Sequence, residues 1–496
     1  MRLRETFEAL SDKTKPWFYS PTYIISVTAI GIFGFVFDLE LYAILAIAFI
    51  VLLNLVFQRD LLPSFLGVAI IGMVPLARYG EVEYFSPLYR IFYPFLPENV
   101  QHYVDASGYG AFVQWFAPFV IIGLIIAFTL RPVVYRVQFK KGRFFYTTLA
   151  VAVAVTLGGA FYLSPSEYFT FPALYYVFFL GIGMLIIYQA MDNYIDETRE
   201  DLFDYFSFMM VAVGVMGIAM VASAYYEHFD VIRESGPGRM FQWRNNLTNN
   251  LLLSMPFAFY LSLKRRFGSV YLALGILQFL VLVFSYSRGG IIFGTLVFPP
   301  LMLATLYLSK GRRMKQLFVL VLVFALVYVA FETWLVPFDQ VLENIMDRVE
   351  ISREESRARM FVQAVERFFA YPVFGTGLAE DVIYSPQPMA MQWYHSTVSQ
   401  VLGSLGMVGV IAFLYQELIR AFTIFELRAR FNLFVLFALI GFGGYSLVNV
   451  GYFVPLPFVY MVLVMFLVLE RHNRILRKNP ALMDAESLPS NLFNGS

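Results

Sequence analysis

The sequence of 496 residues contains no cysteine and few charged residues. Without cysteine the chain forms no disulfides and has neither a thiolate metal site nor a Cys nucleophile. Charged residues make up only 14% of the chain, against about 25% in an ordinary soluble protein. The 36 Lys and Arg nearly balance the 35 Asp and Glu, leaving a formal charge of +1. The basic excess that nucleic-acid binding needs is therefore missing, and we expect no nucleic-acid partner.

Apolar residues, in contrast, dominate the chain. Hydrophobic residues reach 59%, aromatic residues 18% and the mean hydropathy +0.66. The surface-to-volume ratio of a soluble protein of this size leaves too little interior to bury so much apolar surface. A helix needs about 20 apolar residues to cross a bilayer, and about fourteen apolar runs bounded by charge or turn residues are present. The sequence predicts an all-α, polytopic membrane protein with about fourteen transmembrane helices.

The distribution of Lys and Arg predicts the topology. With the N-terminus inside, 25 of the 36 cations fall in inner segments, and the 11 outer cations are all Arg. We expect eleven spans in residues 1–336, a large outer loop at 337–396, three spans in 397–470 and a cytoplasmic tail at 471–496. We expect the end of this tail, from Pro480 on, to be disordered.

The outer loop 337–396 is far longer than the usual connection of about 4–6 residues, so it forms a small module outside the membrane. Residues 349–369 have the pattern of an amphipathic helix. Arg353 and Arg357 are four residues apart and share one face of it. A ligand-binding helix and a helix lying on lipid give the same pattern. Pro372 ends this helix, and a tight glycine turn follows it.

A second feature is the helix boundary at Ser285–Gly290. One helix ends on the outer side, and Arg288 stands at the start of the next, after Ser287. Free backbone N–H groups and the positive end of the helix dipole add to the guanidinium, which makes a site for an anion. The alternative is an Arg that extends to the lipid headgroups.

His395 is one of only four histidines. It precedes Ser396 and Thr397, which have the pattern of a helix N-cap before a long apolar run. A helix N-terminus disfavours the imidazolium, so His395 stays neutral and able to accept a proton as a general base. The alternative is an interfacial histidine without a chemical role. The helix that follows carries glycines at three-residue spacing, which suit close helix packing.

The stretch Gly238–Asn250 is rich in Arg and Asn. Four Asn at the mouth of a membrane helix are unfavourable in lipid, so we expect them to face a wet cavity. There they bind sugar hydroxyls or cap the helix.

We predict no metal site, because the outer carboxylates lack ligand spacing with a His. We expect no cofactor either, because no phosphate-binding Gly-rich loop is present.

The order of these motifs resembles the superfamily of O-antigen ligases and O-antigen polymerases. The motifs are SRGG at 287–290, SRARMFVQAVERFFAYPVFGTGL at 356–378 and HSTVSQVLGSLGMVGV at 395–410. Upstream, GRMFQWRNNLTNNLLLSMPFAF looks like the family's Asn-containing segment. The family pattern has a Trp where this chain has Phe361, and an Asn where it has Ser396. The likeness covers about residues 236–415 and implies the helical architecture of GT-C-like membrane glycosyltransferases.

The resemblance implies transfer of a glycan from undecaprenyl diphosphate to an acceptor hydroxyl at the outer, periplasmic face of the cytoplasmic (inner) membrane. It implies that Arg288 and Arg357 hold the lipid diphosphate and that His395 activates the acceptor. The acceptor is a glycan or a lipid, and both ligase and polymerase activities remain open. The remaining residues that we expect to contact substrate are Arg239, Arg244, Asn246, Asn250, Arg353 and Ser287.

Two other functions deserve comparison. A flippase for lipid-linked oligosaccharides would need charged groups within its helices, whereas the polar groups here gather at the predicted outer boundary. A peptidoglycan-type transferase with similar lipid donors would favour an outer Asp as base, whereas this chain offers His and Arg. Glycan transfer is therefore the preferred interpretation.

Overall fold

In the computed structural model the protein is almost entirely helical, which confirms the all-α prediction. The residues described are 2–37, 39–77, 139, 141–162, 177–196, 198–227, 244–285, 287–309, 311–334, 339, 343, 354–380, 390–391 and 394–488. The only strands among them are β1 (Ala379–Glu380) and β2 (Ala390–Met391). These two pair antiparallel, with Ala379 opposite Met391.

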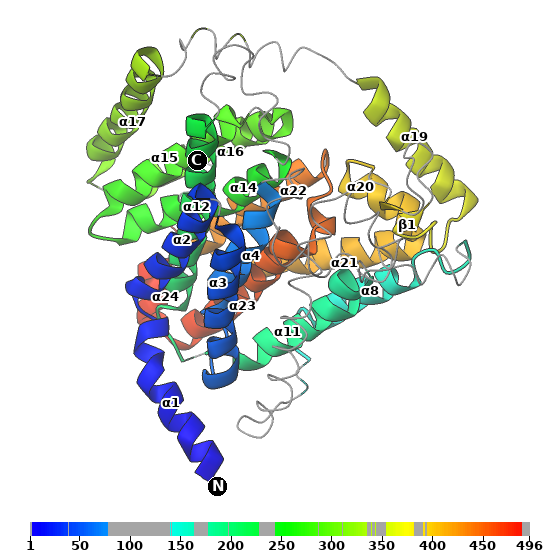
Figure 1. Cartoon of the computed structure of the whole chain (residues 1–496), viewed down its shortest axis with the longest axis horizontal. Coiled ribbons are helices and arrows are strands. Elements are labelled where there is room, and N and C mark those ends of the chain that lie inside the picture. The colour runs from blue at the N-terminus through cyan, green and yellow to red at the C-terminus, as the bar shows by residue number, and fades with distance from the viewer. Residues whose placement is uncertain are drawn as a thin grey trace. The chain divides into compact units, whose positions relative to one another are not determined.

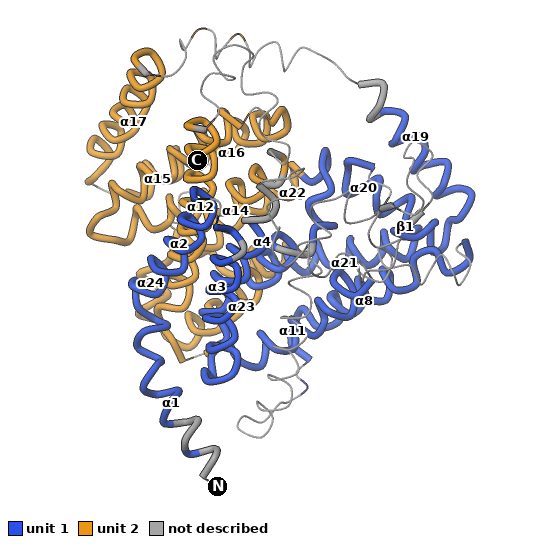
Figure 2. The backbone as a smooth tube through the Cα atoms, viewed as in Figure 1, with its two compact units in different colours: residues 1–195, 353–420, 446–464 blue, residues 196–352, 421–445, 465–496 orange. Residues whose placement is uncertain are grey.

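The chain divides into two compact units (Figure 2). Unit 1 comprises residues 1–195, 353–420 and 446–464. Its elements (Figure 1) are α1 (Arg2–Phe18), α2 (Pro21–Val36), α3 (Glu40–Phe57), α4 (Ser64–Ala77), α8 (Phe145–Leu157), η3 (Val177–Ile182), α11 (Gly183–Tyr194), α19 (Glu354–Ala370), β1, β2, α20 (Thr397–Gln400), η5 (Val401–Leu405), η6 (Gly451–Phe453) and η7 (Pro455–Val459).

Unit 2 comprises residues 196–352, 421–445 and 465–496. Three helices contribute residues to both units: α21 (Gly406–Phe425), α23 (Tyr460–Lys478) and α22 (Arg430–Ser446), whose last residue Ser446 belongs to unit 1. The other elements of unit 2 are α12 (Leu202–Glu227), α14 (Arg244–Lys264), α15 (Gly268–Phe284), α16 (Arg288–Leu308), α17 (Arg313–Trp334) and α24 (Pro480–Glu486).

Several helices have the length and composition of membrane spans. Among the described residues five qualify, and a bent pair formed by the end of α1 and α2 would make a sixth. The five are Val177–Tyr194, Leu202–Tyr226, Arg288–Leu308, Arg313–Thr333 and Thr397–Phe425. Further apolar helices of 10–17 residues include α8, α15 and α22. The chain is thus a multi-pass membrane protein. The predicted count of about fourteen is not confirmed. One of the fourteen apolar runs of the sequence, residues 111–130, lies outside the described residues.

Helix α14 forms the centre of unit 2. It packs against α12, α15 and α16, and its side chains from Thr248 to Leu261 are all buried. Leu251 and Leu252 join Leu282 and Tyr445 in one hydrophobic cluster. Burial of several large apolar side chains stabilises such a cluster by roughly 1.5–3 kcal/mol each. The N-terminal Asn-rich turn of α14 is therefore held by a rigid helix.

In unit 1 the helix predicted for the loop 337–396 packs on an interrupted helix. The predicted amphipathic helix is present as α19, and it packs against η5 and α20. Helix α8 packs against η3, α11 and η5. Two glycines permit close approach between α2, α3 and α4: a Cβ on Gly34 would lie 2.2 Å from that of Ala43, and one on Gly67 would lie 2.4 Å from a Val51 methyl.

The expectation of disorder from Pro480 on is wrong for residues 480–488. They contain α24, which begins after the cap residue Asn479, whose side chain accepts a hydrogen bond from the backbone N–H of Leu482 (3.4 Å). Glu486 is buried and forms an ion pair with Lys264 of α14. A local cap and a long-range ion pair together order this segment, and only the cap can be read from the sequence.

Candidate active site

The N-terminus of α16 carries Arg288 and its capping residue Ser287. Helix α15 ends at Phe284 and α16 begins at Arg288, as the sequence predicts. The Ser287 side chain accepts a hydrogen bond from the backbone N–H of Gly290 (3.3 Å), one of the donors left unpaired where a helix starts. Gly290 lies against α14, where a Cβ would be 2.8 Å from the hydroxyl of Thr248. A side-chain cap and a close helix contact fix this turn.

Arg288 itself is half-buried at the first position of α16. In the described part of the chain, no acidic side chain forms an ion pair with it. The unpaired N–H groups and positive dipole end of a helix favour an anion at this place. The guanidinium is thus suited to a phosphate group, which it grips with several donors at once.

Three side chains from three helices meet behind this turn. Tyr445 of α22 donates a hydrogen bond to the side-chain oxygen of Asn245 on α14 (2.8 Å). Ser287 donates to the same oxygen (3.3 Å), and its hydroxyl lies 3.1 Å from that of Tyr445. Because each partner comes from a different helix, this network ties α14, α16 and α22 together at the level of Arg288.

Further along α14, two buried amides lack partners. Asn249 is fully buried, and among the described residues neither its side-chain nitrogen nor its oxygen has a hydrogen-bond partner. The side-chain oxygen of Asn250, which is 2% exposed, also has none. Buried polar groups of native proteins are nearly always paired, with protein, water or ligand. The wet cavity expected at these Asn residues stays a prediction. The side chains of Arg244 and Asn246, and all of Arg239, lie outside the description.

His395 stands in unit 1, directly before α20. It is exposed and has a φ of 51°, and it is the one non-glycine residue with a positive φ among the described residues. Such a left-handed conformation is unfavourable for residues with a Cβ, and strain of this kind gathers at functional sites. Ser396 caps the helix: its side chain accepts a hydrogen bond from the backbone N–H of Ser399 (3.4 Å), which confirms the predicted N-cap.

Residues around His395 are anchored on both sides. The backbone N–H and the hydroxyl of Thr397 both donate to the carbonyl of Asn449, at 3.0 and 3.1 Å. The backbone N–H of Tyr394 donates to the side chain of Gln400 (3.2 Å). The Tyr394 ring is buried against Gly403, and this burial raises the pKa of its hydroxyl. The exposed imidazole is therefore displayed from a fixed backbone.

The glycine turn after α19 packs on η5. The backbone N–H groups of Thr376 and Gly377 donate to the carbonyls of Gly403 and Ser404, at 3.0 and 2.9 Å. Gly375 has a φ of 63°, and a Cβ there would lie 2.4 Å from the carbonyl carbon of Ser404. The helix from α20 to α21 is locally interrupted, and the turn uses the backbone groups that the interruption sets free.

This turn fixes the helix that carries Arg357. The turn follows α19 directly, and α19 packs against α20 and η5. Unit 1 therefore holds α19 beside the helix that follows His395. Arg357 belongs to the first turn of α19, but its side chain lies outside the description, as does all of Arg353. Arg288 and Ser287 belong to unit 2. Their placement next to His395 remains a prediction.

Sequence reasoning missed three residues that support these sites: Asn245 as a hydrogen-bond partner, Tyr445 and Asn449. The sequence shows Asn245 only as one of the four Asn of the stretch 238–250, and the predicted substrate contact is its neighbour Asn246. Tyr445 lies in an ordinary apolar helix, 158 residues after its partner Ser287. Asn449 lies just after that helix, 52 residues after its partner Thr397. No local pattern marks such long-range partners.

Comparison with known families agrees with the motifs. The family model for O-antigen ligase matches residues 272–414, which include Arg288, Arg357 and His395. No curated protein matches the chain. Within the described residues, no cluster of three or more His, Asp or Glu side chains is suited to a metal ion. Residues 272–414 thus match the O-antigen ligase family, and the resemblance to the O-antigen ligase and polymerase superfamily is confirmed over this segment.

Proposed function

We propose that this protein transfers a glycan from an undecaprenyl-diphosphate donor to an acceptor hydroxyl at the outer face of the cytoplasmic membrane. The observation that carries the proposal is His395, exposed and held in a strained backbone conformation inside the O-antigen ligase match. A capped helix begins just after it. A neutral imidazole before a helix N-terminus suits a general base.

The proposed reaction is a direct displacement. His395 takes the proton of the acceptor hydroxyl, and the oxygen attacks the anomeric carbon. The bond between that carbon and the diphosphate oxygen breaks, and undecaprenyl diphosphate leaves with the electron pair. The sugar is transferred with inversion, because a single base without a nucleophilic carboxylate does not provide for a double displacement.

The Arg residues stabilise the leaving group. Negative charge grows on the departing diphosphate, and preorganised donors stabilise such charge in a low-dielectric site. Arg288 fits this role, because it adds its guanidinium to the free N–H groups at the start of α16. We assign Arg357 to the same diphosphate, and Arg239, Arg244, Asn246, Asn250, Arg353 and Ser287 to other parts of the donor or acceptor.

Transfer by the purified protein tests this function. The donor is a defined glycan on a prenyl diphosphate, and the acceptors are a lipid-linked glycan and a lipid A core. We expect His395→Asn and Arg288→Ala each to lower the rate by at least 10²-fold. Asn tolerates the left-handed backbone of position 395, so that variant tests the base rather than the fold.

Arg312→Ala provides the matched control, because Arg312 is an exposed Arg just beyond the opposite end of α16. It should keep the normal rate. A chelator should leave the rate unchanged, since the proposed chemistry uses no metal. Normal turnover by both His395→Asn and Arg288→Ala would refute the site, and absence of transfer to every acceptor would refute the function.

A further inference from the structure

Helix α19 carries an exposed apolar face in addition to the face that packs on α20 and η5. Exposed side chains of this apolar sector are Phe361, Val362 and Phe369. At 3.6 residues per turn, the three fall within a sector of about 100°. Exposed charged side chains, Arg359 and Glu366, lie about 150° from Phe361 around the helix axis. The helix therefore has a packed sector, an apolar sector and a charged sector.

Aromatic residues extend this apolar surface beyond the end of α19. The Tyr371 ring packs on that of Tyr162, with centroids 4.7 Å apart, and the Phe374 ring packs on that of Phe161 (5.2 Å). The backbone N–H of Gly159 donates to the carbonyl of Phe374 (3.0 Å), which ties the segment after α8 to the turn after α19. Contiguous exposed apolar surface of this kind marks an interaction site. We define the α19 patch as the exposed residues Phe161, Tyr162, Phe361, Val362, Phe369, Tyr371 and Val373.

The depth of the α19 patch in the membrane follows from its contacts with α21. The backbone N–H groups of Met407 and Val408 donate to the carbonyls of Pro372 and Val373, at 2.8 and 3.1 Å. Both donors belong to the first turn of α21, Gly406–Phe425. These 20 residues measure about 30 Å, which is the thickness of the hydrocarbon core. The patch therefore lies at the level where one end of α21 meets a boundary of the core.

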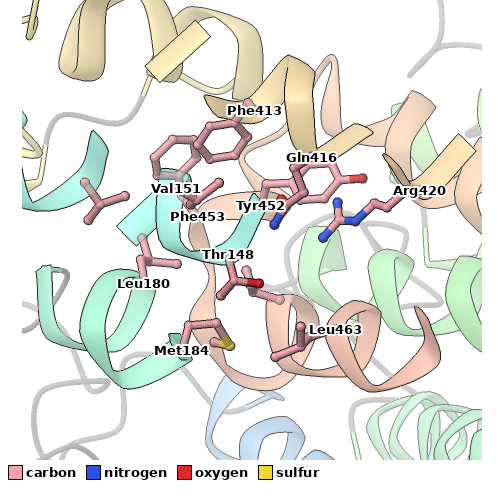
Figure 3. Close-up of a pocket in the computed structure, with 12 residues that line it drawn as sticks. Thr148, Val151, Leu180, Met184, Phe413, Gln416, Arg420, Tyr452, Phe453 and Leu463 are labelled. Carbon is pink, nitrogen blue, oxygen red and sulfur yellow. The ribbon is translucent and has the colours of Figure 1, made fainter. Parts of the chain in front are cut away.

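Helix α8 runs antiparallel to α21 and ends at the same level. Thr148 of α8 and Arg420 of α21 line one small pocket, which has room for about one water molecule (Figure 3). Ten residues after Thr148, Gly158 lies against Leu405, where a Cβ would be 2.8 Å from the Leu405 side chain. The 13 residues of α8 put Gly158 about 20 Å from the start of this helix at Phe145. Both helices thus end their apolar length beside the patch.

Continuity with the exposed face of α21 favours lipid as the partner of the patch. Exposed apolar side chains along α21 include Met407, Ile411, Leu414 and Leu418, at the spacing of one helix face. In a membrane span such a face contacts lipid. The hydrogen bond from Val408 to Val373 brings the patch to the first turn of this face. Tyrosine, which the patch contains twice, is enriched where membrane meets water.

We propose that α19 lies in the membrane interface, with the α19 patch against lipid and its charged sector in water. Interfacial amphipathic helices bury their apolar face roughly 5–10 Å into the boundary between headgroups and acyl chains. Phe361 and Phe369 are about 12 Å apart along the axis, so both reach lipid only if α19 runs nearly parallel to the membrane plane. The cation distribution predicts that this is the outer leaflet. The placement does not depend on glycan transfer.

Spin labels on the full-length protein in lipid nanodiscs test this placement. The chain has no cysteine, so Phe361→Cys and Phe369→Cys each carry a single label. Collisions of the label with oxygen, which concentrates in lipid, are compared with collisions with a water-soluble nickel chelate. Arg359→Cys is the matched control, because Arg359 is about 3 Å from Phe361 along the axis but about 160° around it. We expect the ratio of oxygen to nickel collisions to be at least several-fold higher at positions 361 and 369 than at 359.

Each other arrangement of α19 gives a different result. Frequent nickel collisions at all three positions would place the helix in water, and rare nickel collisions at all three would place the whole helix in lipid. A lipid-like ratio at 369 with a water-like ratio at 361 would show a helix that stands upright. Rare collisions with both reagents at 361 and 369, with dipolar broadening, would show a second copy of the chain on the patch. Any of these results refutes the proposal, and Val362→Cys replaces a label variant that does not fold.

Discussion

At the scale of single residues, His395 is the most informative position. Its φ of 51° costs about 1–2 kcal/mol relative to an ordinary backbone conformation. The surrounding contacts of Tyr394 and Thr397 hold it there. The side chain is exposed, and the general-base role proposed above would account for an imidazole at this strained position.

We therefore predict that His395→Gly separates stability from activity. Glycine adopts a positive φ without strain, so this variant should melt at the wild-type temperature or a few degrees above it. Its transfer activity should fall by at least 10²-fold, because the base is lost. Circular dichroism melting and the transfer assay check both parts. A variant that melts lower yet transfers normally would contradict this assignment.

Tyr445 provides a second prediction at this scale. Tyr445→Phe removes the hydroxyl that bonds to Asn245 and contacts Ser287, while the buried ring remains. We expect a loss of about 1 kcal/mol in the free energy of unfolding. Activity should also drop several-fold, because the turn that displays Arg288 is less well fixed. Tyr146→Phe, at an exposed position on α8, is the control and should change neither quantity.

At the scale of elements, the glycine turn after α19 decides how α19 packs on the interrupted helix that begins at α20. Backbone groups of the turn pair with η5, so the contact needs close approach rather than side-chain recognition. The glycine pattern in the sequence predicts the turn itself. It does not predict that the turn packs on the interrupted helix, because that depends on residues about 30 positions away in the chain.

Gly375→Ala tests this contact. The added Cβ meets the backbone of Ser404, and we expect a loss of more than about 2 kcal/mol in stability. Gly311→Ala is the matched control, because Gly311 also has a positive φ (79°) but no atom within 4 Å of the added Cβ. Strain alone should cost it about 1 kcal/mol. Equal melting temperatures for the two variants would show that the turn does not pack on η5 as described.

At the scale of the whole molecule, unit 2 contains a buried histidine on α23, beyond the predicted span 457–470. Burial lowers the pKa of His472 to about 4, Lys264 lowers it further, and Asp204 acts in the opposite direction. The ring packs against Phe203 and Phe431, and in the described part of the chain neither ring nitrogen has a hydrogen bond. The folded protein therefore holds this imidazole neutral.

This predicts that stability depends on pH. Above pH 6.5 the histidine is neutral in both the folded and the unfolded chain, so its protonation does not reduce the stability of the fold. As the pH falls from about 6.5 towards 4, the unfolded chain binds a proton that the folded chain excludes, so stability decreases, by roughly 2 kcal/mol at pH 5. Melting curves at pH 7 and pH 5 measure the difference. His472→Leu should remove this contribution, and an unchanged pH dependence in that variant would contradict it.

Sequence alone determined the class of the molecule. Apolar runs and scarce charge are properties of composition, and a bilayer imposes helices on such a chain. Helix caps and glycine turns were equally readable, because Ser287, Ser396 and Gly375 act through groups a few residues away. The amphipathic helix of the outer loop and the helix boundary at Arg288 were predicted for the same reason.

Only the tertiary structure decided which distant groups complete these local elements. The partners Tyr445 and Lys264 come from other helices and Asn449 from the segment after α22, and Lys264 orders α24. Packing between distant segments also buries the amides of Asn249 and Asn250 and forms the pocket beside Arg420. Hydrogen bonds, ion pairs and close packing act over a few ångströms in space and are indifferent to separation along the chain. Sequence periodicity therefore predicts elements, whereas packing selects their partners.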